Sequence, residues 1–309
     1  MSLAHLVQFN DQRLSDAQIS DILDDAPVMQ VVNAVAASNG TNHRYKKQTT
    51  ASSAAFRTVD GGVTKTRSAD TQVDVTLKVL DASFKMDVAE ADGYRFGRDA
   101  YLEIELMRSL KQAFFAAESQ MIRGTNYDAN GFAGLEDNAD LNAVADAMVY
   151  NAGGTTADVQ SSVYLIRSGD DDLSYVAGND GNITFNTEDE PSIIEVTDTG
   201  TATYPAYYVP VTGWGGLQKG GLRSVARICN LGTDTGASLD DDKIAEALSL
   251  FPASRQPNLI IMNRASLKQL QQSRTATNVT GAPAPFPSEA FGIPVVVTDA
   301  IVSTEAVVS

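Results

Sequence analysis

The residues able to do chemistry are few. The chain of 309 residues has two histidines, His5 and His43, and any Ser-His-Asp or Cys-His arrangement must use one of them. Cys229 is the sole cysteine, so the chain has neither an intrachain disulfide nor the Cys and His cluster of a zinc site. A catalytic carboxylate pair among the 39 acidic residues remains open, because spacing along the chain does not test it. The sequence favours a protein that is not an enzyme, with a soluble acidic enzyme as the alternative from another class.

One loop has the spacing of a calcium site. Asn126, Asp128 and Asn130 occupy alternate positions, and Asp137 stands at the twelfth position. The pattern begins with Asn instead of Asp and ends with Asp instead of Glu, and the same residue types are typical of turns. No glycine-rich loop with a lysine that would hold phosphates is present. We therefore expect no metal and no cofactor, with these four residues as the only weak candidates.

The charge balance restricts the partners. The 39 acidic and 23 basic residues give a net charge of −16, which argues against a general nucleic-acid-binding surface. The first ten residues, MSLAHLVQFN, lack a basic region followed by a long apolar core, so no signal peptide is expected. No window reaches about 18 apolar residues, so no membrane span is expected. The lone cysteine fits an intracellular, reducing setting.

Residues 99–123 give the longest helical pattern of the chain. They contain no Gly or Pro, Asp99 can cap the first turn, and Gly124 stands where a helix usually ends. A helix of this length is about 37 Å long. Charged residues project near its apolar face, and a buried charge needs a partner. The residues that share the apolar face are Ala100, Met107, Leu110, Phe114, Ala117 and Met121.

Residues 41–90 read as a long two-stranded excursion. Residues 41–67 are polar and basic, Asp60-Gly61-Gly62 is a hairpin turn signal, and residues 71–80 alternate in polarity. The alternation continues through residues 84–88. An isolated ribbon is marginally stable in water. It therefore folds onto its own domain or reaches a neighbouring subunit.

The remaining elements mix without a regular order. Residues 15–23 and 28–37 read as two short helices, the first with Ser15 and Gln18 as a capping box. Strands are expected at 162–167, 222–231, 259–262 and 292–298. Helices are expected at 240–251 and after Asn263, which is expected to cap the second helix. This irregular alternation predicts an α+β fold.

Several phrases, in order along nearly the whole chain, resemble tailed-bacteriophage major capsid proteins. They are NAVAASNGTNHRYK, FRTVDGGVTKTRSADTQVDVTLKVLDASFKMDVAEAD, ESQMIRGTNYDANGFAGL, WGGLQKGGLRSVARICNL, NLIIMNRASLKQLQQSR and FGIPVVVTDAIVSTEA. The resemblance implies the capsid fold of that family, with an extended loop, a spine helix at 99–123, a peripheral domain and an axial domain. The implied divisions are an N-terminal arm at 1–40, the extended loop at 41–90, part of the peripheral domain at 91–150, a mainly axial part at 151–290, and a C-terminal return to the peripheral domain at 291–309.

The same resemblance implies a structural function. The protein would assemble as pentamers and hexamers into an icosahedral shell around double-stranded DNA, in the virion capsid and after assembly in the host cytoplasm. The acidic balance would keep the packaged genome from adhering to the inner wall. Residues 1–14 are too few for a fused scaffolding domain, so a separate scaffolding protein is expected, together with a portal and possible decoration proteins. An encapsulin-like nanocompartment shell is the alternative within the same fold.

The resemblance also places the subunit interface on the extended loop, where basic residues would meet a neighbour's acids. A Lys–Asn cross-link between subunits, known in some relatives, is not indicated by anything in the sequence. The residues expected at the interface are Arg44, Lys46, Lys47, Phe56, Arg57, Lys65 and Arg67.

Overall fold

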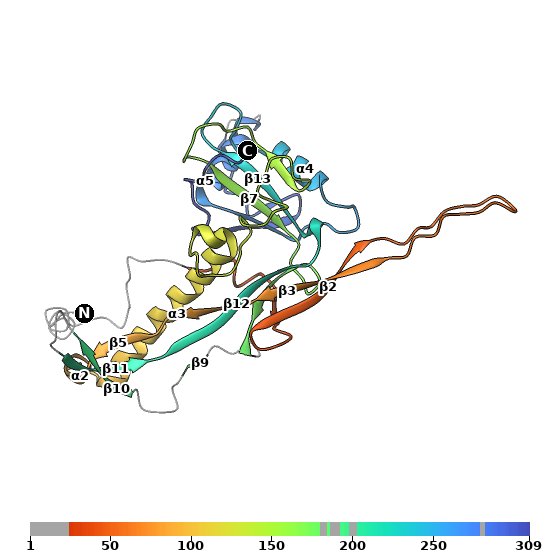
Figure 1. Cartoon of the computed structure of the whole chain (residues 1–309). Helices are drawn as coiled ribbons and strands as arrows, with labels where there is room; N and C mark the ends of the chain where they lie inside the picture. The colour runs from red at the N-terminus through yellow and green to blue at the C-terminus, as the bar shows by residue number, and fades with distance from the viewer. Residues whose placement is uncertain (1–24, 180–183, 186–191, 198–202, 279–281) are drawn as a thin grey trace.

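The computed structural model describes residues 25–179, 184–185, 192–197, 203–278 and 282–309. Figure 1 shows a compact unit that contains the C-terminus, and a long helix, α3, that runs from it toward a small group of strands at the opposite end. A two-stranded ribbon, formed by β2 (Asn42–Thr50) and β3 (Ala69–Thr76), projects sideways from the body. The mixed sheets and helices confirm the α+β class.

The compact unit is built on a six-stranded sheet with the order β15-β16-β14-β7-β13-β6. Strand β7 runs antiparallel to both β13 and β14, whereas the β13–β6 and β14–β16 pairs are parallel. All residues of β7, β13 and β14 are buried, which explains their nearly continuous apolar sequences. The strand bounds are Val149–Asn151 (β6), Ser161–Ile166 (β7), Val225–Leu231 (β13), Leu259–Met262 (β14), Glu289–Ala290 (β15) and Ile293–Val297 (β16).

Two helices belong to the compact unit, and side chains cap both. In α4 (Asp241–Ser249) the carboxylate of Asp240 accepts a hydrogen bond from the Lys243 backbone N–H at 2.8 Å. In α5 (Arg264–Ala276) the Asn263 amide oxygen accepts one from the Ser266 N–H at 2.8 Å. The predicted Asn263 cap is confirmed, and such caps are worth about 1 kcal/mol each. Helix α4 packs against β13 and β6.

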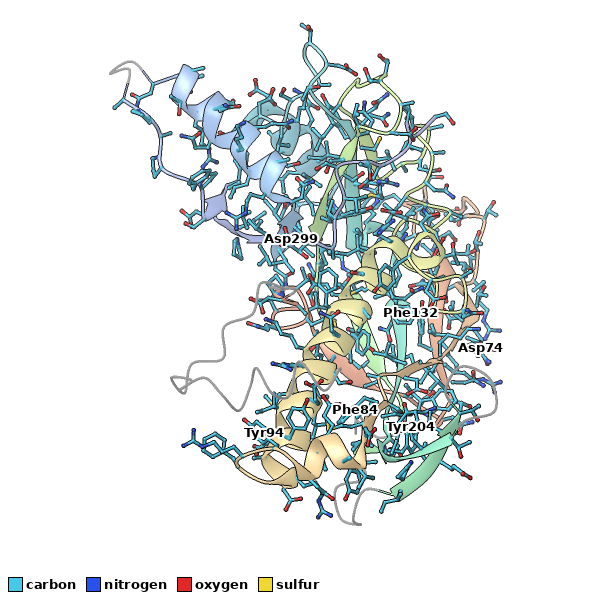
Figure 2. The ribbon with its side chains drawn as sticks, turned by 90° about the vertical axis from the view of Figure 1, so that its left-hand side faces the viewer. Asp74, Phe84, Tyr94, Phe132, Tyr204 and Asp299 are labelled. Carbon is cyan, nitrogen blue, oxygen red and sulfur yellow. The ribbon has the colours of Figure 1, made fainter. Side chains whose placement is uncertain are left out.

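Two further sheets extend away from the compact unit along α3. The first has the order β1-β8-β12-β4, with β9 paired to β12, and the second has the order β10-β11-β5. A short helix, α2 (Val88–Asp92), lies at the far end with the second sheet, where Figure 2 labels Phe84, Tyr94 and Tyr204. The strand bounds are Ala34–Ala36 (β1), Lys78–Asp81 (β4), Phe84–Asp87 (β5), Leu173–Ala177 (β8), Thr184–Phe185 (β9), Ser192–Thr197 (β10), Thr203–Val209 (β11) and Val211–Lys219 (β12).

Helix α3 (Arg98–Arg123) confirms the predicted long helix, but its start and its burial differ from expectation. Gly97 is the N-cap, with φ 93°, and Asp99 lies in the first turn, where its charge favours the helix dipole without capping it. The helix is buried near its two ends, around Tyr101 and along 117–122. Between these ends, Met107 and Phe114 of the expected apolar face remain 60% and 44% exposed.

The buried carboxylate of Glu118 joins three parts of the chain. It accepts hydrogen bonds from the backbone N–H groups of Val28 at 2.8 Å and Met29 at 3.2 Å, and from the hydroxyl of Thr298. Burial raises the pKa of Glu118, and these hydrogen bonds partly oppose that rise. The expectation that a charge near the apolar face needs partners is therefore met at this residue.

Three sequence expectations are corrected by tertiary contacts. Residues 28–37, predicted as a helix, form turns followed by β1, because β1 pairs with β8 and Glu118 binds the preceding N–H groups. The predicted helix at 15–23 lies outside the described residues. Val88, predicted to continue a strand, begins α2, because the Asp87 carboxylate accepts from the Ala89 N–H. The strand predicted at 222–231 begins at Val225, after a 3₁₀ turn, η3 (Leu222–Ser224).

The glycine-rich run before that turn lies inside the nine-residue strand β12. A Cβ at Gly216 would lie 2.5 Å from a methyl carbon of Leu77, and one at Gly215 would lie 2.1 Å from the hydroxyl oxygen of Tyr175. These positions need glycine because neighbouring side chains fill the space where a side chain would project.

The predicted divisions of the chain do not coincide with single sheets of the structure. Residues 41–90 were predicted to form one two-stranded excursion. In the structure only β2 and β3 pair with each other in this range, whereas β4 pairs with β12 and β5 pairs with β11. Strands β8 to β12 lie along α3, and the division at 290 and 291 falls between the paired strands β15 and β16. The names axial and peripheral for these parts stay predictions.

Candidate functional site

The ribbon is the part of the described chain with the least support from its own fold. Beyond β2 and β3 it continues as an extended hairpin, with the Ser53 N–H donating to the Thr66 carbonyl at 3.0 Å. At the tip, the Gly61 N–H donates to the Thr58 carbonyl at 3.0 Å, and Asp60 adopts φ 60°. The predicted turn at Asp60-Gly61-Gly62 is confirmed, because Asp tolerates the left-handed conformation.

Apolar side chains at the tip face solvent. Phe56 is fully exposed and Val59 is 91% exposed. A single exposed apolar residue is ordinary, but both lie near the end of a hairpin without a core of its own. Phe56 was among the expected interface residues, whereas Val59 was not, because no pattern in the sequence marks a lone valine beside a turn as exposed. The described chain therefore leaves both side chains at the tip uncovered.

The basic residues expected at the interface are spread along the ribbon. Arg44 forms an exposed ion pair with Asp74 across the strands, at 2.9 Å. Lys47 is half-buried at the base of the ribbon. The remaining expected basic residues are exposed, and they are Lys46, Arg57, Lys65 and Arg67. The ribbon therefore presents positive charge on a chain whose net charge is −16.

The base of the ribbon is fixed to β12. The Tyr45 hydroxyl donates to the Lys219 carbonyl at 2.7 Å, and the His43 Nε2 lies 2.7 Å from the Gln218 side-chain oxygen. The His43 Nδ1 accepts from the Ser38 N–H at 3.2 Å, so both nitrogens of this imidazole have structural partners. His5 lies outside the described residues. Sequence reasoning treated residues 41–67 as one extended segment and did not separate this fixed base from the free tip.

A cleft of about 950 Å³ lies at this base, beside an ion pair. Lys219 and Asp140 are 3.1 Å apart, and burial lowers the pKa of the Lys219 amine, while the carboxylate of Asp140 opposes that fall. The cleft is lined by cations such as Arg223 and Arg255 and by anions such as Asp170. Such a mixed lining does not define a substrate.

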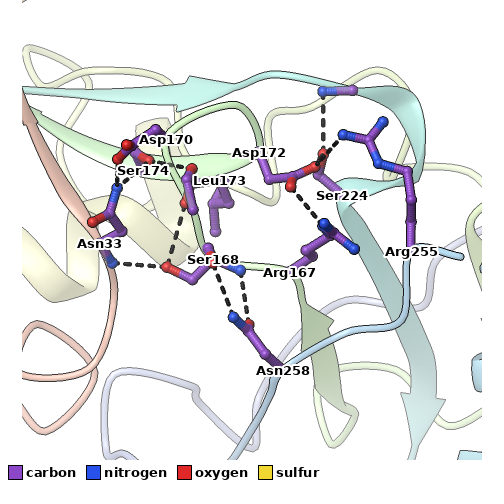
Figure 3. A network of polar contacts seen from close by, with 12 residues as sticks. Asn33, Arg167, Ser168, Asp170, Asp172, Leu173, Ser174, Ser224, Arg255 and Asn258 are labelled. Atoms are coloured by element: carbon purple, nitrogen blue, oxygen red, sulfur yellow. Dashed lines mark hydrogen bonds and ion pairs between the residues drawn. The ribbon is translucent and has the colours of Figure 1, made fainter.

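The Asp172 carboxylate is the centre of a network of polar contacts between several segments of the chain (Figure 3). Its carboxylate lies 2.6 Å from Arg167 and 3.4 Å from Arg255, and it accepts a hydrogen bond from the Ser224 hydroxyl at 2.9 Å. In the same network, the Asn258 amide pairs with the backbone of Ser168. These hydrogen bonds and ion pairs connect strands and loops of the fold, so we assign the network a structural role.

The candidate calcium loop uses its oxygens internally. The Asp137 carboxylate accepts from the Thr125 N–H at 2.7 Å and the Gly134 N–H at 3.0 Å. Burial alone raises the pKa of Asp137, but these hydrogen bonds and the Thr125 hydroxyl outweigh it and hold the pKa below its usual value. Asp128 accepts from the Asn130 N–H, and Asn126 donates to Glu136. Within the described ranges, no group of three or more His, Cys, Asp or Glu could hold a metal.

Comparison with solved structures defines the class of this fold. A chain of bacteriophage Epsilon15 superposes with a TM-score of 0.71 and 20% identity, covering 100% of this chain and 98% of that chain. The bacteriophage JBD30 capsid gives a TM-score of 0.55 and 12% identity, covering 97% and 99%. An encapsulin of Synechococcus elongatus reaches 0.43, with 11% identity over 76% and 97%. This chain has the HK97-like fold of phage capsids.

The sequence then identifies the family. The family model of the major capsid protein GP7 matches residues 11–309, so the chain belongs to this family of major capsid proteins. No curated protein matches it. The predicted resemblance to tailed-phage major capsid proteins is confirmed, and the protein is a structural component of a phage capsid. In the part of the chain that the structure describes, no helix is both long enough and apolar enough to cross a membrane.

Proposed function

We propose that this major capsid protein closes an icosahedral shell of pentamers and hexamers, and that its ribbon is the contact between neighbouring subunits. The observation that carries this proposal is the exposed apolar tip, Phe56 and Val59, on a hairpin that stands away from the body. Burying two such side chains against a neighbour is worth about 1.5–3 kcal/mol each. The basic residues of the ribbon add charge complementarity with a subunit that is acidic overall.

The compact unit and the elongated part are proposed as the axial and peripheral domains of the shell. On this proposal β16 and the C-terminus belong to the axial domain, whereas the sequence had led us to expect residues 291–309 in the peripheral domain. Membership of the major capsid protein family supports an assembly that also involves a scaffolding protein, a portal, possible decoration proteins and packaged double-stranded DNA, formed in the host cytoplasm. The proposed role is structural and not catalytic, which membership of this capsid protein family supports.

Assembly of the double variant Phe56→Ser/Val59→Ser tests the interface. We expect its subunits to keep the thermal unfolding temperature of the native chain, because the tip supports no core. Shells and capsomers should be lost or strongly reduced in light scattering and negative-stain microscopy with scaffold present. Thr58→Ser, between the two positions, is the matched control and should assemble normally. Normal shells from the double variant would contradict the proposed contact.

A further inference from the structure

The last residue of β12, Lys219, carries a largely buried amine. Its backbone carbonyl accepts the hydrogen bond from the Tyr45 hydroxyl that fixes the base of the ribbon. Burial lowers the pKa of the Lys219 amine, although the carboxylate of Asp140 opposes that fall. Burial therefore favours the neutral amine, which is the form of lysine that acts as a nucleophile.

A side-chain amide lies next to this amine. The Lys219 Nζ donates to the side-chain oxygen Oδ1 of Asn138 at 2.9 Å. Since a carbonyl bond is about 1.2 Å long, the amide carbon Cγ lies within about 4 Å of Nζ. Reacting atoms need to approach to about 3–3.5 Å, and rotation of the two side chains can close the difference.

The Asn138 oxygen already has a second donor, which is suited to a developing negative charge. The Asp140 backbone N–H donates to Oδ1 at 2.9 Å. Attack on Cγ moves charge onto this oxygen, and a backbone N–H that is fixed beforehand stabilises such an oxyanion. The loop therefore supplies an electrophile together with a donor for its oxyanion.

A carboxylate stands beside the amine, where it can transfer protons. The Asp140 carboxylate lies 3.1 Å from the Lys219 Nζ, which is within reach for proton transfer. Asp140 is partly exposed, and it lines the cleft of about 950 Å³ at the base of the ribbon. A small molecule released at this point can therefore leave through the cleft.

We propose that Lys219 and Asn138 form an intrachain isopeptide bond, with Asp140 as the proton-transfer group. Asp140 first accepts a proton from the Lys219 ammonium. The neutral amine then attacks Asn138 Cγ, so the Nζ–Cγ bond forms while the carbonyl π electrons move to Oδ1. Asp140 returns its proton to the amide nitrogen Nδ2, and the Cγ–Nδ2 bond breaks as the carbonyl forms again. The ammonia that leaves takes the remaining extra proton from Nζ and departs as ammonium. No electrons are gained or lost, so the step needs no oxidant or further reactant.

The bond joins two parts of the fold. Lys219 and the preceding Gln218 hold the base of the ribbon through Tyr45 and His43, whereas Asn138 belongs to the loop that follows α3. The isopeptide therefore ties the strand under the ribbon to the loop after the long helix. It lies within one subunit and does not depend on the ribbon interface proposed above.

The mass of the intact native chain tests the proposal. After incubation of the full-length protein at mildly alkaline pH, we expect a mass lower than that of the sequence by one ammonia. Tandem mass spectrometry should find a branched peptide that joins positions 138 and 219. An unchanged mass would overturn the proposal, and so would the loss of one water from a bond between Lys219 and Asp140.

Three variants assign the roles, with thermal unfolding as the check that each is folded. Lys219→Arg and Asp140→Ala should each keep the full mass of their own sequence. Lys243→Arg is the matched control, because Lys243 is also a largely buried lysine, paired with the Asp240 carboxylate at 2.6 Å. This control should still lose one ammonia. Persistence of the loss in Lys219→Arg or in Asp140→Ala would overturn the proposed reaction.

Discussion

At the scale of single residues, the buried Glu118 carboxylate is the acceptor for groups from two distant segments. Replacing it with alanine leaves the Val28 and Met29 N–H groups and the Thr298 hydroxyl without this acceptor. We expect Glu118→Ala to lower the free energy of unfolding by about 1–3 kcal/mol for each buried donor left unpaired. Glu118→Gln keeps an amide oxygen for the two N–H groups and should lose less. Denaturant unfolding of unassembled subunits measures both, and equal losses would contradict this account.

The pH dependence of stability gives a second observable for Glu118. Burial raises the pKa of Glu118 in the folded state. The folded chain therefore binds the proton of this carboxyl more tightly than the unfolded chain does. Its contribution to stability is therefore fully present below the ordinary pKa of a glutamate and is lost as the pH rises through the raised value. The stability of the native chain relative to Glu118→Gln should fall over that interval. A difference that stays constant with pH would show that this carboxylate is not the titrating group.

A second buried charge, Arg227, joins β13 to the C-terminal segment. Its guanidinium lies 2.9 Å from the Glu305 carboxylate and donates to the Ser162 hydroxyl at 2.9 Å. Breaking such a pair leaves an uncompensated buried charge, so Glu305→Ala should destabilise the subunit by about 3–5 kcal/mol. The double variant Arg227→Met/Glu305→Leu should lose less than the sum of the losses of Arg227→Met and Glu305→Leu. Additive losses in a double-mutant cycle would mean that the pair is not coupled.

At the scale of elements, the end of α3 depends on a glycine. Gly124 has φ 56° and ψ −129°, and a Cβ there would lie 2.4 Å from the Gly134 nitrogen. We expect Gly124→Ala to destabilise the subunit by about 1–3 kcal/mol from backbone strain, with the steric overlap adding to this loss. Gly40→Ala, where a Cβ would meet nothing within 4 Å, is the matched control. Thermal unfolding compares the two, and similar temperatures would contradict the requirement for glycine at 124.

The helices, the helix cap and the turn that were predicted correctly are those specified by residues close together in the sequence. Helix α3, helix α4, the Asn263 cap of α5 and the turn at Asp60 arise from propensities and hydrogen bonds within a few residues, and all were predicted. The strand β1 was not, because its pairing partner β8 lies more than 130 residues away. Of the candidate interface, the basic ribbon was visible in the composition, whereas the exposure of Val59 required the structure.

At the scale of the whole molecule, the acidic balance bears on contact with DNA, which we propose the shell encloses. With a net charge of −16, the chain lacks the excess of Lys and Arg that a general phosphate-binding surface needs, although the ribbon itself is basic. We expect unassembled subunits not to retard duplex DNA in an electrophoretic assay at near-physiological salt. The variant Lys65→Glu/Arg67→Glu should behave in the same way. Retardation by the native chain that this variant abolishes would show that the ribbon contacts DNA.

The sequence by itself determined the α+β class, the long helix, the basic ribbon and the family, since these depend on local pattern and on the order of phrases along the chain. Only the tertiary structure decided how the strands are divided among the sheets and that Glu118 holds Val28, which is 90 residues away. It also showed that the apolar face of α3 remains open at Phe114. These features depend on contacts between distant segments, and the pattern of a single segment does not specify which surface will cover it.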